Sequence, residues 1–422
     1  MPAIADPRAF LEGLFDAAVA AADPDQMLER CLPEKPKGRT VVIGAGKGAA
    51  QMARAFGRLW DGPLSGVVVT RYGFAVPCDR IEVLEAAHPV PDESGLSASA
   101  KLMSTVHGLT EDDLVVALIC GGGSSLLPAP AGDLTLSDEV AVNKALLASG
   151  APISAMNAIR KQISRIKGGR LAALAYPARV VSLVVSDIPG DNLALVASGP
   201  TIADTTSRLD ALRLIDQYCL DLPEAVLRHV RDGKDDAPLP TDPRFARNDA
   251  RLVASAATSL EAAAEAARRS GVEAVILSDA IEGEASDVGA VHAAIAAEVA
   301  RRNRPFRKPV VILSGGETTV SIRGNGKGGR NGEFLLSLAR RIDGMETVSA
   351  LAADTDGIDG SEDNAGAFAD GTTVRRLLEK QRDPAELLAN NDSWSAFSAI
   401  GDLFVPGPTG TNVNDFRAIL VQ

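Results

Sequence analysis

The sequence predicts an α/β protein with two domains, and three observations indicate this. The chain has 422 residues, which exceeds the roughly 100 to 200 residues of a usual domain. Short apolar runs without polar alternation, such as TVVIGAG and LVVALIC, are typical of strands that are buried on both faces of a parallel sheet. Longer stretches with helical periodicity separate these runs, and this alternation is typical of open sheets covered by helices.

Composition and charge exclude several function classes. Apolar residues make up 46% of the chain and charged residues 23%, which is a globular balance rather than a disordered or fibrous one. The 43 Lys and Arg against 55 Asp and Glu give a net charge of −12. Such a chain has no general attraction to nucleic acid or to an anionic membrane. An anionic ligand must therefore be bound by local groups.

The cysteines and the N-terminus predict a cytoplasmic protein. The four cysteines lie far apart, without the CxxC or Cys/His spacing of a zinc site. Scattered cysteines of this kind are typical of reduced thiols. The chain does not open with a basic segment followed by an apolar core, and no stretch approaches the roughly 18 apolar residues of a membrane helix.

The first domain, residues 1–241, is predicted to open with a helix and to continue as a Rossmann-like, mainly parallel sheet. Asp6 and Pro7 have the residue types of a helix N-cap and first helical position, and apolar residues follow from Phe10 to Ala18 at helical spacing. After the breaker run PEKPKGR, buried strands are predicted in TVVIGAG, SGVVVTR, IEVLEAA, LVVALIC and RVVSLVVSD.

The second domain, residues 242–422, is predicted to be a smaller mixed sheet with helices. Residues 221–250 are rich in Pro, Asp and Arg, which is typical of a crossover, and the boundary is placed near Asp242. Strands EAVILSD and KPVVILSGGE alternate with helices from Thr258 to Arg269 and in VHAAIAAEVARR. Short strands with turn-rich connections follow in TTVSIRG, TVSALAAD, DLFVP and FRAILVQ, which indicates mixed pairing.

Glycine clusters follow predicted strands at the edge where open α/β sheets bind ligands. In VVIGAGKGAAQ the turn around Gly46 precedes a helix whose first N–H groups would attract an anion, and Lys47 could reach a phosphoryl group as a point charge. The turn is no P-loop, and it has only the looser GxGxxA form of the dinucleotide fingerprint. The alternative is a plain tight turn with a solvated lysine.

The second cluster, CGGGSSLL, predicts a nest for the phosphates of a nucleotide. Glycines permit close approach of a ligand to the backbone, and two hydroxyl groups follow them. The candidate cofactor-binding residues are Gly121, Gly122, Gly123, Ser124 and Ser125. A serine hydrolase is disfavoured because GxSxG is absent and only four histidines could serve as the base. A structural glycine turn is the alternative.

The segment ISAMNAIRKQISRIKGG predicts one amphipathic helix. Isoleucines and Met156 form its buried stripe, which leaves Asn157, Arg160, Lys161 and Lys167 on the other side. With Arg165, these make four cations within eight residues of an acidic protein, which suggests that the segment binds an anionic substrate. A solvated basic face is the alternative.

Carboxylates follow two other strands. Asp187 ends a strand in VVSDIPGDN and Asp191 lies in the turn after it, so either could hold Mg²⁺ together with substrate phosphates. In ALAADTDGIDG, Asp354 and the aspartates after it suggest a role with Mg²⁺ or a substrate hydroxyl, because the spacing lacks that of an EF-hand. Capping of turns is the alternative at both places.

The densest cluster is LSGGETTVSIRGNGKGGRNGEFLLSL. Its seven glycines imply backbone packed tightly around a ligand, with Glu317 among the polar residues between them. Arg330 would lie at the start of the following helix, where its guanidinium could bind a phosphate or carboxylate in bidentate fashion. A flexible surface hairpin is the alternative.

Together these motifs resemble the class II glycerate kinases, the glycerate 2-kinase family whose C-terminal part is called the MOFRL domain. The matching segments extend in order from about residue 40 to 415, and the most specific of them is GGET to GGRN. They are VIGAGKGA, CGGGSSLL, NAIRKQISRIKGGRLA, SDIPGDNLALVASGPT, LSGGETTV, GNGKGGRNGEF, AADTDGIDG and GPTGTNVND. The MOFRL-like region would span about residues 308–416.

The resemblance implies that the chain phosphorylates D-glycerate at its 2-hydroxyl, with ATP and Mg²⁺, in an active site in the cleft between the two domains. Lys47 and Arg330 look like the two cations that matter most for catalysis. D-glycerate and a nucleotide are the expected partners, with no nucleic acid or membrane among them. The oligomeric state stays open, with a homodimer as one candidate.

The remaining roles are hypotheses built on phosphoryl transfer, which needs positioning and charge neutralisation. ATP phosphates would lie over the 121–125 nest. Mg²⁺ would be held through Asp187, Asp191 or Glu317. Candidate substrate contacts are Asn157, Arg160, Lys161 and Asp354, with the glycerate carboxylate held by Arg160, Lys161 or Arg330. Asp187 is favoured over Asp354 as the base for the 2-hydroxyl.

Two other function classes stay as alternatives. Members of this family are often labelled hydroxypyruvate reductases, and an NAD(P)H-dependent reductase is the main alternative. It would need a full GxGxxG and an acidic residue about 20 residues later, where Thr70 and Arg71 stand instead. A metabolite sensor without catalysis is the other, although it has little need for so many cations and carboxylates.

Overall fold

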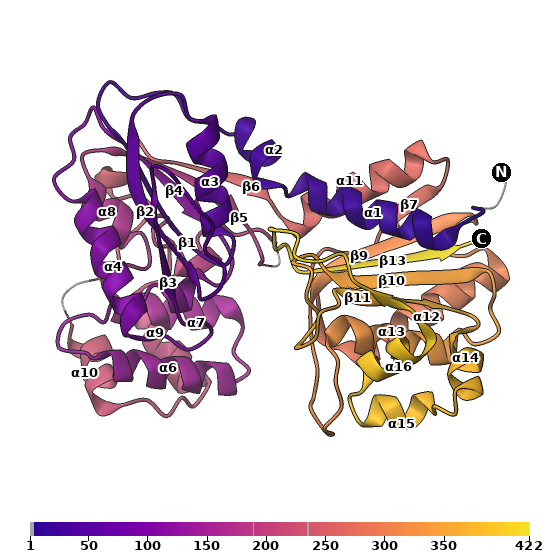
Figure 1. Ribbon diagram of the computed structural model, residues 1–422. Helices are drawn as coiled ribbons and strands as arrows, with labels where there is room; N and C mark the ends of the chain where they lie inside the picture. The colour runs from indigo at the N-terminus through magenta and orange to yellow at the C-terminus, as the bar shows by residue number, and fades with distance from the viewer. Residues whose placement is uncertain (1–3, 189, 234–235) are drawn as a thin grey trace. The chain divides into compact units, whose positions relative to one another are not determined.

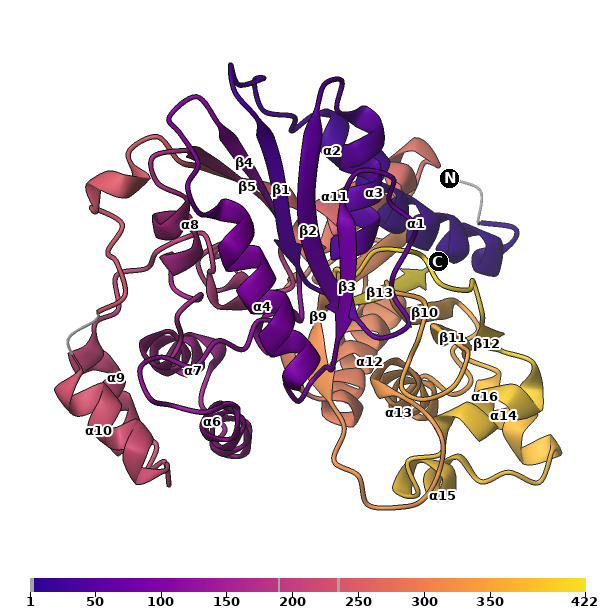
Figure 2. The same ribbon diagram turned by 60° about the vertical axis from the view of Figure 1, so that its left-hand side comes forward.

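The chain divides into two compact units. The computed structural model describes residues 4–188, 190–233 and 236–422 (Figures 1 and 2). The N-terminal unit is Pro24–Val253, and the C-terminal unit joins Met1–Asp23 to Ala254–Gln422. Each unit is built around its own sheet, and both are α/β, as the sequence predicts.

The N-terminal unit contains an all-parallel sheet of six strands in the order β3-β2-β1-β4-β5-β6. The strands are β1 (Thr40–Ala45), β2 (Leu64–Arg71), β3 (Glu82–Ala86), β4 (Leu114–Ile119), β5 (Arg179–Val185) and β6 (Asp249–Ala254). Every residue of β1 and β4 is buried, which explains their lack of polar alternation. The order is that of Rossmann folds, whose chain reverses its direction of winding between β1 and β4 and binds ligands there.

Helices cover both faces of this sheet. Helix α3 lies on one face, whereas α4 and α8 lie on the other (Figure 1). Helices α6, α7, α9 and α10 pack into a cluster of their own around Ile159 and Ile163. The helices of the unit are α2 (Pro24–Glu29), α3 (Ala49–Leu59), α4 (Glu93–Val106), α5 (Gly123–Leu126), α6 (Leu136–Ala148), α7 (Ile153–Arg160), α8 (Arg170–Ala175), α9 (Arg208–Gln217) and α10 (Glu224–Asp232).

The C-terminal unit contains a mixed sheet of seven strands, which confirms the predicted mixed pairing. The order is β12-β11-β10-β13-β9-β7, with β8 also paired to β9. Strands β7 and β8 run parallel to β9, and the other pairs are antiparallel. The strands are β7 (Glu273–Ile276), β8 (Ile281–Glu284), β9 (Val310–Thr319), β10 (Val348–Asp354), β11 (Gly366–Asp370), β12 (Leu403–Phe404) and β13 (Asp415–Val421).

Two groups of helices enclose this sheet. Helices α1 and α11 pack on one face, and α12 to α16 pack on the other (Figure 1). The helices are α1 (Pro7–Ala21), α11 (Ala256–Arg269), α12 (Ala285–Arg302), α13 (Arg330–Arg341), α14 (Thr373–Glu379), α15 (Pro384–Ala389) and α16 (Ser393–Ile400).

The two units differ from the predicted domains 1–241 and 242–422 at the N-terminus and at the boundary between the domains. Helix α1 forms as predicted, with Asp6 capping it, but its apolar stripe packs on α11 and the C-terminal sheet. Its periodicity shows that one side is buried and carries no information about the partner. The chain passes from the C-terminal unit to the N-terminal unit after Asp23 and returns after Val253. The return lies beyond the predicted boundary near Asp242, because 249–254 form β6 of the N-terminal sheet.

The predicted single helix over ISAMNAIRKQISRIKGG is wrong. Helix α7 ends at Arg160, a 3₁₀ turn follows, and Ser164 has extended backbone angles. Lys161 and Lys167 are each only 1% exposed and form ion pairs with Asp204 and Glu139 respectively. The alternative of a solvated basic face is therefore wrong for Lys161 and Lys167, which form buried ion pairs within the unit.

The Lys167–Glu139 pair leads to a stability prediction. Replacing Lys167 with methionine leaves the carboxylate of Glu139 buried without its cation, and we expect this to lower the free energy of unfolding by about 3 to 5 kcal/mol. Urea denaturation checks it. Lys101→Met is the matched control, because its pair with Glu82 is half exposed and should contribute less than about 1 kcal/mol. Similar losses in both variants would contradict the prediction.

His292 in the C-terminal unit leads to a pH prediction. Its Nδ1 lies 2.8 Å from the Val288 carbonyl and its Nε2 lies 2.9 Å from the Ser314 hydroxyl. Burial, reinforced by Arg417, lowers the pKa of His292 to about 4 from the ordinary 6.5. His292 is therefore protonated below about pH 6.5 in the unfolded chain, but only below about pH 4 in the folded protein.

We expect the folded protein to lose stability as the pH falls. Lowering the pH from 7 to 5 should cost roughly 2 kcal/mol through His292 alone. Urea denaturation at both pH values checks it, with His292→Gln as the comparison. The variant has a lower starting stability, but its loss between pH 7 and pH 5 should be smaller than that of the wild type. An equal loss in both proteins would show that His292 does not carry the effect.

Candidate functional site

The loops at the carboxyl edge of the N-terminal sheet bring several predicted site residues together. Lys47, His88 and Asp187 each lie two residues beyond the end of β1, β3 and β5 respectively, and Arg71 is the last residue of β2. The glycines 121–123 follow β4. Parallel strands present all these positions at one edge, and β1 and β4 flank the point where ligands bind in folds of this order.

The turn after β1 uses its backbone N–H groups within the chain. The N–H of Gly46 donates to Val69 O at 3.2 Å, that of Lys47 to Gly121 O at 2.8 Å, and that of Gly48 to Cys120 Sγ at 3.2 Å. Gly46 has a φ of +136°, and a Cβ there would lie 2.4 Å from the Cys120 carbonyl oxygen. Packing against β4 therefore explains the glycine, and the turn offers no row of free donors for a pyrophosphate.

The loop after β4 differs, because its N–H groups stay available. In the part of the chain that the structure describes, the backbone N–H groups of residues 121 to 124 have no acceptor. Gly122 requires its glycine for a φ of +81°. Consecutive N–H groups at the end of a strand are suited to binding an anion. This geometry supports the predicted nest at 121–125.

A chain of hydrogen bonds joins this loop to a predicted substrate residue. The Ser124 hydroxyl lies 2.8 Å from that of Ser198, which donates to Asn157 Oδ1 at 2.8 Å. Asn157 in turn donates to the Leu195 carbonyl at 2.8 Å. Ser198 and the preceding Ala197 both have positive φ, which is uncommon outside glycine and is often found at functional sites.

The predicted cations have different surroundings. Arg160 is buried, which lowers its pKa to about 10, and it donates to Asn143 and Asn157. Lys161 is ion-paired with Asp204, and Arg330 contacts three carboxylates. The ammonium of Lys47, by contrast, has no ion pair or hydrogen bond with any residue that the structure describes. Lys47 is therefore free to bind a ligand.

The predicted metal ligands come from both units. Asp187 lies against Gly121, whose Cβ would be 2.0 Å from its Oδ2, whereas Glu317 belongs to the other unit. Asp191 lies in the turn beyond Asp187 and is partly buried. No group of three acidic, His or Cys side chains within the described residues could hold a metal ion. A single carboxylate beside the 121–124 loop still fits Mg²⁺, which often binds through one protein carboxylate, waters and substrate phosphates.

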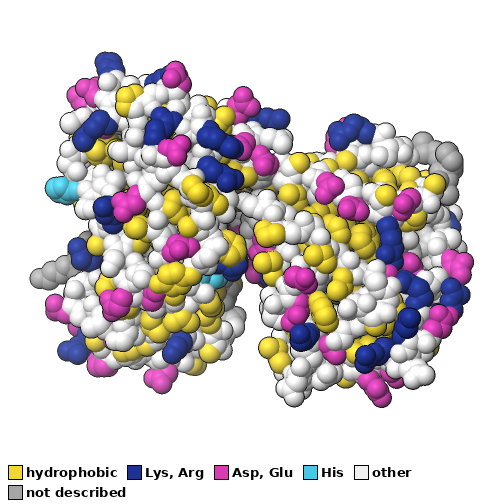
Figure 3. Space-filling model, in the orientation of Figure 1, with side chains coloured by type: hydrophobic (Ala, Val, Ile, Leu, Met, Phe, Trp, Pro, Cys, Tyr) yellow, Lys and Arg dark blue, Asp and Glu magenta, His cyan; other side chains and the backbone are white. Residues whose placement is uncertain are grey.

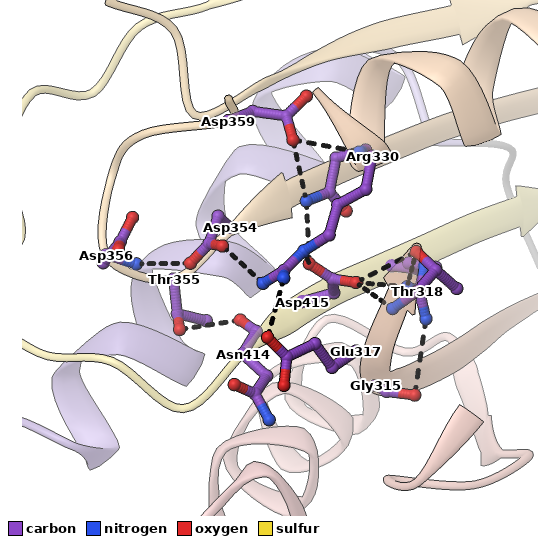
Figure 4. Close-up of polar contacts among 12 residues, drawn as sticks. Gly315, Glu317, Thr318, Arg330, Asp354, Thr355, Asp356, Asp359, Asn414 and Asp415 are labelled. Atoms are coloured by element: carbon purple, nitrogen blue, oxygen red, sulfur yellow. Dashed lines mark hydrogen bonds and ion pairs between the residues drawn. The ribbon is translucent and has the colours of Figure 1, made fainter. Parts of the chain in front are cut away.

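In the C-terminal unit, Arg330 lies among three carboxylates (Figure 4). Its Nε donates to Asp415 at 2.7 Å, its Nη2 to Asp354 at 2.7 Å, and its Nη1 to Glu317 at 2.9 Å. The register of the sheet explains this arrangement, because Asp354 pairs with Asp415 and Asp415 pairs with Gly316. Two carboxylates directly opposite each other would repel, and the guanidinium between them offsets that repulsion.

Asp415 extends this network into the core. It also accepts from the Asn331 side chain at 2.9 Å and forms an ion pair with Arg417, whose side chain is fully buried. Arg417 donates further to the Thr318 hydroxyl at 3.0 Å. Asp415 is thus fixed from several sides and holds the guanidinium of Arg330 in one orientation.

The other aspartates near Arg330 support the helix that carries it. Asp359 accepts from the N–H groups of Asn331 and Gly332 in the first turn of α13, and burial raises its pKa to about 6. Burial and the neighbouring Asp356 raise the pKa of Asp354 well above its ordinary value, against the influence of Arg330. In this structure Asp354, a predicted substrate residue, contacts Arg330.

The glycines between residues 324 and 332 have structural reasons. A Cβ at Gly324 or Gly326 would collide with Asn390, and one at Gly329 with Asp359. Backbone N–H groups of residues 323 to 327 donate to the turn 390–392. The segment is therefore neither a free hairpin nor, in itself, a ligand cradle. The glycines allow it to pack on that turn and so place the start of α13.

Several residues around the 121–124 loop and around Arg330 were not predicted from the sequence. His88 had a usable signal, because it follows β3 by two residues just as Lys47 follows β1. Asp415 ends the quoted motif GPTGTNVND, but its contacts, like those of Arg417, depend on the register between β13 and its neighbours. Ser198 lies in a quoted motif, but its contact with Ser124 joins residues 74 positions apart.

The distribution of charge on the surface and the character of the helices do not indicate a particular ligand. Acidic and basic side chains are interspersed on the face of each unit that Figure 3 shows. Within the described ranges, none of the helices has the length and apolar character needed to cross a lipid bilayer.

Two family models match the chain. The one described as "Domain of unknown function (DUF4147)" covers residues 10–231, and the one described as "MOFRL family" covers residues 310–415. The second match lies within the region of about 308–416 that was predicted to resemble MOFRL.

Similar proteins of full length carry two different names. A protein of Agrobacterium vitis named "Putative hydroxypyruvate reductase" is 53% identical, over 98% of this chain and 94% of that protein. A glycerate 2-kinase of Pyrococcus horikoshii is 40% identical, over 97% of this chain and 96% of that protein. The crystal structure of a glycerate kinase from Thermotoga maritima matches with a TM-score of 0.89 at 36% identity, over 98% of this chain and 99% of the other.

Proposed function

The chain belongs to the glycerate kinase family that combines DUF4147 and MOFRL domains, and from that premise we propose that it is a glycerate 2-kinase. In this reaction a phosphoryl group passes from ATP to the 2-hydroxyl of D-glycerate, giving 2-phosphoglycerate and ADP. The observation that carries the proposal is the contrast between two loops. In the turn after β1 the backbone N–H groups donate hydrogen bonds to other residues of the chain. In the loop after β4, beside Lys47, the backbone N–H groups of residues 121 to 124 have no acceptor among the described residues.

This contrast favours a phosphoryl donor over a dinucleotide. A nicotinamide cofactor in a Rossmann fold places its pyrophosphate on the N–H groups of the turn after β1. Those of Gly46, Lys47 and Gly48 already have acceptors. Residues 121 to 124 supply the donors instead, next to a lysine without a carboxylate partner, which suits the β- and γ-phosphates of ATP.

The proposal assigns roles to the chain's own residues at this edge. The N–H groups of 121–124 and the hydroxyl of Ser125 bind phosphate oxygens, and Lys47 neutralises the transferred group. Asp187 is proposed to hold Mg²⁺, which would supply positive charge next to the phosphates. Asn157 and Arg160, joined to Ser124 through Ser198, are proposed to position glycerate. Lys161 is left out, because Asp204 pairs with it.

The chemistry forms one bond and breaks one. The 2-hydroxyl oxygen of glycerate attacks the γ-phosphorus, the bond to the β-bridging oxygen breaks, and ADP leaves. The hydroxyl proton must pass to a base, for which Asp187 remains the proposal. Arg330 is proposed to stabilise the transferred group as the second cation. It belongs to the C-terminal unit, so both units would contribute to one reaction, and the predicted position of the active site in a cleft stays a prediction.

A reductase is the second candidate, favoured by the name of the 53% identical Agrobacterium vitis protein. Arg71 at the end of β2 adds to it, since an arginine near this position can accommodate the 2′-phosphate of NADP. The reductase would oxidise NADPH with hydroxypyruvate, whereas the kinase consumes ATP only when glycerate is present.

The test is an ATP-consumption assay with D-glycerate and Mg²⁺, with the product identified by NMR. We expect 2-phosphoglycerate. Formation of 3-phosphoglycerate would keep the kinase and overturn the proposed acceptor hydroxyl. If ATP is not consumed while hydroxypyruvate oxidises NADPH, the reductase is correct and the roles assigned to the 121–124 loop are wrong.

A further inference from the structure

At the carboxyl edge of the N-terminal sheet, three nitrogen-bearing side chains carry no hydrogen bond or ion pair within the described part of the chain. Neither the guanidinium of Arg71 nor the imidazole of His88 forms an ion pair or hydrogen bond with a described residue, and the same is true of the Lys47 ammonium. They come from the ends of three neighbouring strands, β2, β3 and β1. The phosphate roles proposed above use only Lys47.

Three buried cations of the same unit do have polar partners. Lys161 and Lys167 each pair with a carboxylate, and Arg160 donates to two asparagines. Buried or half-buried basic groups usually have such partners, because their desolvation is otherwise unfavourable. The absence of partners for Arg71 and His88 therefore indicates a place for a ligand that supplies the acceptors.

The positions of His88 and Lys47 relate them to the 121–124 loop. A Cβ on Gly122 would lie 3.1 Å from His88 Nε2 and 3.1 Å from Lys47 Cγ. Both side chains therefore pack over the residue whose N–H is free. Arg71 is held over the Phe74 ring, with its guanidinium carbon 3.6 Å from the ring centre, and this contact leaves the planar N–H groups available.

We propose that Arg71 and His88 complete, with Lys47 and the N–H groups of residues 121 to 124, a binding site for the polyphosphate chain of a nucleotide. This inference rests on the proposed function and extends it to two residues that have no assigned role. A single carboxylate would be bound by one cation and a few donors. Two cations, an imidazole and four N–H groups suit a ligand with several negative charges.

The charge state of His88 agrees with this site. Burial, followed by the positive charges of Lys47 and Arg71, lowers its pKa to about 4. The imidazole is therefore neutral at pH 7, with one N–H to donate to a phosphate oxygen and no third positive charge next to the other two. The carboxylate of Asp187 lies against Gly121 of this loop, and the function proposed above assigns Asp187 to Mg²⁺.

The test measures the binding of sodium tripolyphosphate to the full chain by calorimetry, without glycerate. We expect Arg71→Gln to weaken binding about tenfold or more and His88→Phe, which keeps a ring but removes its donor, to weaken it about fivefold. Arg54→Gln is the matched control, because Arg54 is exposed on α3 of the same unit and its loss removes the same charge. This control should change the affinity less than twofold. Circular dichroism confirms that each variant is folded.

The outcomes separate this inference from the proposed function. Arg71-dependent binding of tripolyphosphate supports the site, even if the wild type phosphorylates no glycerate. An affinity that is unchanged in Arg71→Gln, equally reduced in Arg54→Gln, or absent in the wild type overturns it. If Arg71→Gln instead weakens only the binding of NADPH, Arg71 binds a 2′-phosphate. The inference then fails and the reductase gains support.

Discussion

Replacing Lys47 with methionine is expected to lower kcat for the phosphorylation of D-glycerate by about a hundredfold or more. The proposed role of Lys47 is to neutralise the phosphoryl group during transfer, when charge spreads over its oxygens. No carboxylate in the described residues occupies its ammonium, so removing it exposes no unpaired partner. Methionine retains most of the aliphatic length that packs over Gly122. The fold should therefore survive.

Steady-state kinetics with varied ATP and glycerate check this prediction. A loss mainly in kcat, with KM changed little, indicates an interaction made in the transition state. Lys101→Met, which removes an exposed lysine of the same unit, should retain normal turnover. Near-normal turnover in Lys47→Met would remove Lys47 from the mechanism.

Much of the fold could be predicted because burial leaves a direct mark on the sequence. All residues of β1 and β4 are buried, so their apolar runs indicated a parallel sheet. The restart of this rhythm after residue 250 indicated a second unit. The partner of α1 could not be predicted, because an apolar stripe shows that one side is buried but not which sheet covers it.

The site could be predicted only where chemistry is local. Glycines after strands indicated the edge at which ligands bind, yet they could not show which loop keeps its N–H groups. Gly46 and Gly122 look alike in sequence, and the difference arises because residues 120 and 121 accept from the first loop. Lys161 and Lys47 are likewise both lysines of predicted site motifs, and only the distant Asp204 shows that the first is structural.

Arg330 leads to the second large expected effect, and its surroundings decide how it must be tested. Arg330→Ala would leave the buried Asp354 without a cation, opposite Asp415, which would keep only its pair with Arg417. We expect this to lower the free energy of unfolding by about 3 to 5 kcal/mol, so that a loss of activity could reflect unfolding rather than catalysis. The informative variant is Arg330→Lys, which keeps the charge.

Arg330→Lys should lower kcat by about a hundredfold while destabilising the protein less than Arg330→Ala does. A lysine is a point charge and cannot donate to three carboxylates in the orientations that Nε, Nη1 and Nη2 now hold. Because Glu317 is the half-exposed partner, its contact is the one that a transferred phosphoryl group could replace, whereas buried Asp415 and Asp354 keep the guanidinium in place. Kinetics and urea denaturation of both variants check this, with exposed Arg323→Lys as the control. Normal turnover in Arg330→Lys would mean that Arg330 only neutralises the carboxylates of the C-terminal sheet, and phosphoryl transfer would then depend on the N-terminal unit.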